Sequence, residues 1–168
     1  MPKGVLEKAM DYLALRPLST GELRSKLSNS GIYTQEEIEN ALEICRSRGY
    51  LNDALLASDA VQFLNSCGKG ERIIRQKLRS RGIGSEDLES ALAELTPEDE
   101  RAAAKSAAEG KLRLLVREKD MRKKREKLFR FLLSRGFSPG VTGETVRELL
   151  SDHQEDEDFP EPELQTDI

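Results

Sequence analysis

Apolar residues recur along the chain at intervals of three and four, in short segments separated by glycine. The segment 23–42, LRSKLSNSGIYTQEEIENAL, shows the pattern, because Leu23 and Leu27 precede its glycine and Ile38 and Leu42 follow it. Such spacing places the apolar side chains on one face of a helix. Strict alternation of apolar and polar residues, which would indicate strands, is absent throughout. We therefore predict an all-α protein built from short amphipathic helices.

Glycines that precede an apolar residue mark where these helices end. A glycine just past a helix adopts the left-handed backbone conformation, and the next side chain folds back onto the last turn. Four positions carry this signal: Gly31, Gly49, Gly82 and Gly136.

The expected helix starts carry their own signals. Ser19 with Glu22, and Thr34 with Glu37, have the spacing of capping boxes. Three further starts are marked by Ser85 before two acids, by the pair Thr96-Pro97, and by Asn52 or Asp53 as an N-cap. The motif GYLND at 49–53 is therefore expected to shape the scaffold and to carry no chemistry.

The chain also repeats itself. A leucine stands four residues before the glycine in each of three segments, 23–42, 74–92 and 128–149. The glycines of these segments, Gly31, Gly82 and Gly136, lie 51 and 54 residues apart. A period near fifty, with helices too short to bury their apolar faces alone, indicates modules that stack on one another.

We therefore expect an elongated array of three tandem three-helix repeats, at 5–48, 52–95 and 97–150. The third repeat departs most from the others, since VTGETV inserts flexible residues where the other copies run straight into a helix. The remaining residues, 151–168, form an acidic tail that we expect to be disordered because it combines low hydrophobicity with dense charge.

Charge is segregated along the chain. Of the 168 residues, 37% are hydrophobic and 35% charged, and the net charge is −4. Six Lys and Arg face one acid at 69–81 and thirteen face four acids at 101–135, whereas 151–168 holds eight acids and no base. Without the tail the body is basic, which indicates a polyanionic partner such as nucleic acid. The alternative interpretation is a set of solvated helix faces.

A first basic row is expected on the helix that follows Gly70. Ile73, Ile74 and Leu78 form its inward stripe, and the cations fall on another face. The candidate binding residues are Lys69, Arg72, Arg75, Arg79 and Arg81. Arginines three and four residues apart repel one another, so an anionic partner would stabilise the row. Pairing within the chain, with Glu86, Asp87 or Glu89, is the structural alternative.

A second basic cluster lies near residue 125. Its candidate binding residues are Arg122, Lys123, Lys124, Arg125 and Arg130, with Lys127 between them. Each phosphate that such a cluster neutralises adds close to one unit of salt dependence to binding. Phe129 and Phe131 are available to stack on a base, or they belong to the core, where aromatic side chains on packed helices usually lie.

Several classes of function are disfavoured. The chain has no apolar run long enough to cross a membrane and its start has no signal-peptide pattern, so we expect a soluble intracellular protein. Two cysteines without a CxxC motif and a single histidine provide too few zinc ligands. We find no phosphate-binding GxxxxGK motif, no nucleophile elbow and no metal-binding carboxylate pair, and we predict no cofactor and no enzymatic activity.

Three stretches together resemble the RecX family of bacterial recombination regulators. They are RSRGYLNDALLASDAVQFL, followed by GKGERIIRQKLRSRGI with SEDLESAL, and later LFRFLLSRGFS. The resemblance covers residues 9–150. It implies three tandem three-helix repeats that bind the RecA recombinase filament, restrain its growth and its ATP-dependent activities, and in some members bind DNA. The acidic tail, the NSCG loop and the third repeat depart from the family pattern.

The favoured function is thus a regulator of the RecA filament, acting as a cytoplasmic monomer with weak, salt-dependent binding to single- or double-stranded DNA. Two other classes remain open: a DNA-binding repressor of the helix-turn-helix type, and a helical scaffold that binds only protein. For the tail we hypothesise a segment that mimics DNA and competes for the basic rows. A tail that only improves solubility is the alternative.

Overall fold

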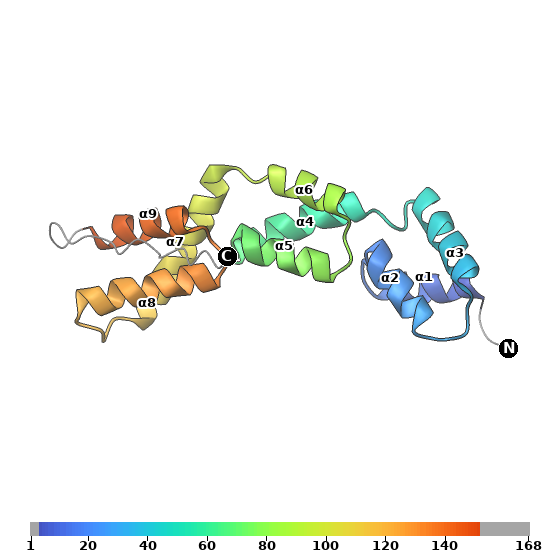
Figure 1. The fold of residues 1–168 in the computed structure, drawn as a ribbon, viewed down its shortest axis with the longest axis horizontal. Helices are drawn as coiled ribbons and strands as arrows, with labels where there is room; N and C mark the ends of the chain where they lie inside the picture. Colours follow the sequence, from blue (N-terminus) through green and yellow to red (C-terminus); the bar gives the residue numbers. More distant parts are fainter. Residues whose placement is uncertain (1–3, 152–168) are drawn as a thin grey trace, which may run out of the picture.

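The computed structural model describes residues 4–151, and within them all regular secondary structure is helical (Figure 1). The helices are α1 (Val5–Leu15), α2 (Thr20–Ser28), α3 (Gln35–Ser47), α4 (Asp53–Ser66), α5 (Glu71–Ser80), α6 (Ser85–Ala93), α7 (Pro97–Leu114), α8 (Met121–Ser134) and α9 (Pro139–Leu150). They form three three-helix units arranged in a long array, which confirms the predicted fold class. The acidic tail lies outside the described residues, apart from Ser151.

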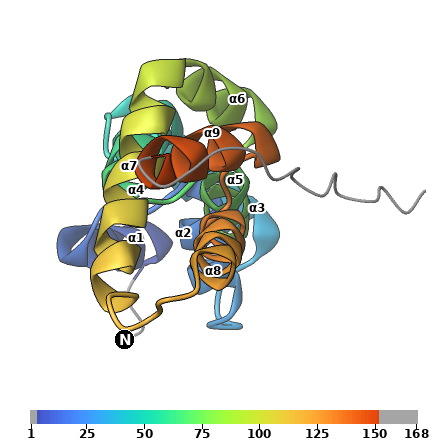
Figure 2. The same ribbon diagram turned by 90° about the vertical axis from the view of Figure 1, so that its left-hand side faces the viewer.

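Each unit buries a core of its own. In the first unit Leu23, Leu27 and Leu42 have no exposed surface. The second unit is built around Ile74, Leu78 and Leu88, and the third around Leu128, Leu132 and Val146. Because these cores do not merge, the array gains length instead of thickness, and Figure 2 shows the units stacked one behind another along the long axis.

Most of the predicted helix ends are confirmed. Complete capping boxes join Ser19 to Glu22 and Thr34 to Glu37, and a third is present at Thr96 with Pro97 in the first turn. Asn52, not Asp53, caps α4. The four predicted glycines have φ values between 65° and 92°.

The helix start predicted at Ser85 is confirmed. Ser85 is the first residue of α6, Gly84 is its N-cap, and Glu86 and Asp87 lie in its first turn.

The expectation about the third unit was wrong. The segment VTGETV, expected to be flexible, lies entirely within α9. Ser138 caps this helix, Pro139 occupies its first turn, and the buried residues Thr142, Thr145, Val146 and Leu150 pack it against the third unit. Burial of that face outweighs the low helix propensity of two glycines.

The second helices of the units lie end to end. Figure 1 shows α8, α5 and α2 in one line, each ending where the next one begins. Between α8 and α5, the backbone N–H of Gly70 donates to Arg135 O at 2.9 Å, and that of Arg72 donates to Gly136 O at 3.2 Å. Free N–H groups at the start of α5 thereby satisfy free carbonyls at the end of α8. The aligned helix dipoles favour the same arrangement.

The junction between the first two units depends more on side chains. Ser19 Oγ donates to Arg81 O, and the backbone N–H of Thr20 donates to Asp53 Oδ1 at 2.8 Å. Glu22 accepts bonds from Arg16 at 3.0 Å and from Arg81 at 3.2 Å. Burial alone would raise the pKa of Glu22, but the bonds from Arg16, the Ser19 backbone and Arg81 outweigh it and lower the pKa to about 2. Asp53 therefore serves the scaffold, as expected for GYLND.

Candidate functional site

The first basic row lies on α5, where Arg75 is already neutralised inside the unit. Its guanidinium bonds Glu71 Oε1 at 2.7 Å and also bonds Glu89 of α6. The hydrogen bond that Arg75 donates to Glu89, followed by the one it donates to Glu71, raises the pKa of Arg75, and the bond to Glu89 lowers the pKa of that carboxyl. Arg75 is therefore paired within the chain, as the structural alternative for this row expected.

Two further arginines of the row hold the units together. Arg72 Nη2 donates to Leu133 O of α8 at 3.0 Å, and Arg81 pairs with Glu22 of the first unit. These contacts reach across the two junctions. Sequence reasoning missed this role, because nothing in the local pattern distinguishes an arginine at a junction from one that faces solvent.

The remaining cations of α5 are available for binding. Lys69 is half-buried and Arg79 is exposed, and neither forms an ion pair with another described residue. Lys77, which the sequence analysis did not single out, is also exposed and unpaired within residues 4–151. The row of five candidates thus contains two side chains that form no ion pair with another described residue.

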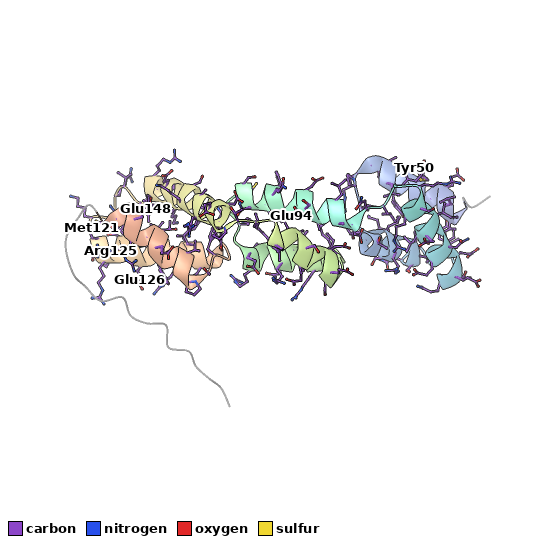
Figure 3. The ribbon with its side chains drawn as sticks, turned by 90° about the horizontal axis from the view of Figure 1, so that it is seen from above. Tyr50, Glu94, Met121, Arg125, Glu126 and Glu148 are labelled. Carbon is purple, nitrogen blue, oxygen red and sulfur yellow. The ribbon has the colours of Figure 1, made fainter. Side chains whose placement is uncertain are left out.

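The second basic cluster lies at the start of α8, at the far end of the third unit (Figure 3). Within the part of the chain that the structure describes, Arg122, Lys124 and Arg125 form no ion pair, and Lys123 lies 3.8 Å from the N-cap Asp120. The first turn of α8 contains no acid. Cations near a helix N-terminus oppose the helix dipole, so an anionic partner would stabilise this end of the helix.

The later residues of α8 are more strongly compensated. Arg130 bonds Glu126 one turn earlier, and Lys127 bonds Glu118 at 2.6 Å. Phe129 and Phe131 are half-buried against the core of the third unit. The ring of Phe131 also lies beneath Lys111 and Arg135, at 5.4 and 5.0 Å from its centroid. This packing supports the core interpretation of the two aromatics.

The cationic side chains of these two surfaces favour anionic groups. Guanidinium and ammonium groups at the start of α8 suit phosphates or carboxylates. No helix within residues 4–151 has the length and apolar character needed to cross a membrane. Across the same residues, no three His, Cys, Asp or Glu side chains gather closely enough to hold a metal ion.

Comparison with known proteins identifies the fold. Residues 6–45 match the first three-helix domain of RecX, and residues 98–144 match the third. A crystal structure of RecX from Lactobacillus salivarius superimposes with a TM-score of 0.77 at 25% identity, over 86% of this chain and 94% of that one. Another regulatory protein RecX superimposes with a TM-score of 0.75 at 29% identity, over 89% of this chain and 72% of that one.

Curated relatives carry the same name. The regulatory protein RecX of Vibrio vulnificus is 37% identical over 146 residues, which cover 87% of this chain and 90% of that protein. The regulatory protein RecX of Limosilactobacillus reuteri is 32% identical over 94% of this chain, which spans only 56% of that longer relative. The chain therefore belongs to the RecX family of regulatory proteins, which are not enzymes.

Proposed function

We propose that this protein binds the RecA recombinase filament and restrains its assembly, its ATP hydrolysis and strand exchange. Membership in the RecX family supports the proposal, and the arrangement of the units carries it further. Three units in single file present a long surface that can contact several repeating subunits of a filament at once. Each contact can then be weak while the overall affinity is high, because once the first contact has formed the others form at a high effective concentration.

The basic start of α8 is the part of the protein that we expect to contribute most to filament binding. Arg122, Lys124 and Arg125 form no ion pair with another described residue, so their binding to phosphate or carboxylate breaks no existing ion pair. Lys69 and Arg79 of the first basic row are expected to contribute next, because they also form no ion pair with another described residue. We assign Arg72, Arg75 and Arg81 to the scaffold first, since a partner would have to displace their present bonds.

The protein acts as a monomer in the bacterial cytoplasm, where RecA filaments assemble on DNA. Its own affinity for DNA, single- or double-stranded, is weak because few phosphates are neutralised at one time. That affinity falls with salt because each neutralised phosphate releases counterions. A steep fall in filament affinity with salt separates this function from that of a scaffold that binds only protein. DNA affinity that depends on base sequence would favour a repressor of the helix-turn-helix type.

The test is ATP hydrolysis by RecA on single-stranded DNA, with this protein added below the RecA concentration. The wild type is expected to inhibit hydrolysis, and the triple variant Arg122→Gln/Lys124→Gln/Arg125→Gln is expected to inhibit it weakly. The matched control is Arg24→Gln/Arg46→Gln/Arg101→Gln, which removes the same number of charges from arginines that are paired with Glu39, Glu43 and Glu98.

Equal loss of inhibition in both triple variants would show that only net charge matters. No inhibition by folded wild-type protein would overturn the proposed function itself.

A further inference from the structure

The first and third units each set an aromatic ring beneath a cation where their first and second helices meet. In the first unit, Tyr12 of α1 lies beneath Lys26 of α2, with the ammonium 5.3 Å from the ring centroid. Lys8 covers the same ring at 5.0 Å. In the third unit the partners are exchanged, since Lys111 of α7 covers Phe131 of α8. In both units the ring already has a cation–π partner within the protein.

The second unit keeps both partners but leaves them apart. Gly82 follows Gly31 by 51 positions, and the same offset carries Tyr12 to Phe63 and Lys26 to Lys77. Phe63 is 66% exposed, and no cation among the described residues covers its ring. A groove of about 320 Å³ opens here between α4 and α5. Its lining residues are Ala60, Phe63, Leu64, Lys77, Leu78, Ser80 and Arg81.

The lining of this groove has a definite chemical character. Ala60 and Leu64, which are half-buried, provide an apolar surface, and Phe63 offers a ring. Lys77 and Arg81 are cations, and the lining contains no acid. The volume lies at the lower end of the range for small-ligand sites, about 300–1,000 Å³. A suitable occupant therefore combines a flat apolar group with a negative charge beside it.

We infer that this groove binds one nucleotide of a single-stranded nucleic acid. The base stacks on the ring of Phe63, and Lys77 neutralises a neighbouring phosphate. Stacking on an aromatic ring accepts any base, because every base has a π face. A duplex is excluded, since its bases are stacked on each other and their faces are not accessible. An acidic peptide with one apolar side chain is the competing occupant.

Arg81 stays paired with Glu22, and Lys77 carries the charge that the groove offers to a ligand. Arg81 Nη2 bonds Glu22 at 3.2 Å, and the low pKa of that carboxyl keeps the acid charged, which leaves the arginine partly neutralised. Lys77 forms no ion pair with a described residue, so it supplies most of the uncompensated charge. The groove is distinct from the start of α8, where the filament contact was placed, and its test uses no RecA.

The experiment measures binding of a fluorescent oligothymidylate to the full chain at low salt. A second probe has the same length and phosphates but abasic sites in place of the bases. Phe63→Ala is expected to weaken oligothymidylate binding by about 5- to 150-fold, the range for loss of one stacked base. Binding of the abasic probe is expected to change little, and Phe63→Tyr, which restores a ring, is expected to match the wild type.

Leu55→Ala is the matched control. Leu55 is also on α4 and is 58% exposed, but it does not line the groove. Melting curves for each variant show whether it is folded, and none of the exposed side chains contributes to the core. Unchanged affinity in folded Phe63→Ala, equal loss in Leu55→Ala, or equal binding of both probes by the wild type would overturn the inference. So would Phe63-dependent binding of an acidic peptide without Phe63-dependent binding of the oligonucleotide.

Discussion

Replacing Gly70 with alanine is expected to separate the second and third units. An added Cβ would lie 2.3 Å from Gly136 C and from Phe137 N. Non-bonded carbons rest about 3.5 Å apart, so the two backbones must move apart by about 1 Å. Gly70 has a φ of −79°, which any residue adopts. The substitution therefore tests the close approach of the units and not the freedom of the backbone.

The expected loss of stability follows from the bonds at this junction. A shift of about 1 Å would lengthen the bond from Gly70 N to Arg135 O beyond the range of a hydrogen bond, and that from Arg72 N to Gly136 O with it. Two such bonds contribute about 1–3 kcal/mol together. Alanine is also a poorer N-cap than glycine. We expect the free energy of unfolding to fall by about 2–4 kcal/mol.

Urea unfolding and small-angle X-ray scattering measure the effect. Because each unit has its own core, the helices should survive while the unfolding transition broadens and the radius of gyration rises. The control is Gly110→Ala, within α7, where nothing lies within 4 Å of the added Cβ. It should stabilise the protein by about 0.5–1 kcal/mol through helix propensity. A Gly70→Ala protein with wild-type midpoint and scattering would refute the tight junction.

Three other expectations can be checked by denaturation. The pKa of Glu22 is lowered in the folded protein, so the charged carboxylate stabilises the fold by about 3 kcal/mol above pH 4.5, and this stabilisation is lost as the pH falls through about 2. Glu22→Gln should lack this acid dependence, and a variant that keeps it would contradict the assignment. Thr142→Val should leave stability unchanged or raise it by about 1 kcal/mol, because Thr142 Oγ1 is buried without a hydrogen-bond partner among residues 4–151; a clear loss would reveal a missed partner. Arg75→Gln should lower stability by at most about 1 kcal/mol and leave inhibition of RecA intact, since its charge is used within the unit; loss of inhibition with an unchanged melting curve would instead place Arg75 at the filament.

Local signals in the sequence predicted the helices well. Capping boxes at Ser19 and Thr34 depend on residues three positions apart, and helix-ending glycines depend on the backbone of one residue. The repeat was visible for the same reason, because each unit encodes its own apolar stripe. The exception was α9, where the helix is set by burial against α7 and α8 and not by its local propensity.

The candidate site was predicted only in part. The sequence located the cations on α5 and at the start of α8, but it did not separate those that bind neighbouring carboxylates and carbonyls from those without a partner. The groove beside Phe63 was missed as well. Its signal was present in the offset of 51 residues that relates Tyr12 and Lys26 to Phe63 and Lys77, but that offset has meaning only once the first unit shows ring and cation in contact.

The sequence by itself therefore determined the all-helical class, most helix ends and the repetition of three units, because these depend on interactions within a few turns of chain. Only the tertiary structure decided how the units join and which charges remain uncompensated. Those outcomes depend on residues about 60 positions apart, such as Arg72 with Leu133 and Glu22 with Arg81, whose meeting is set by the packing of one unit against the next.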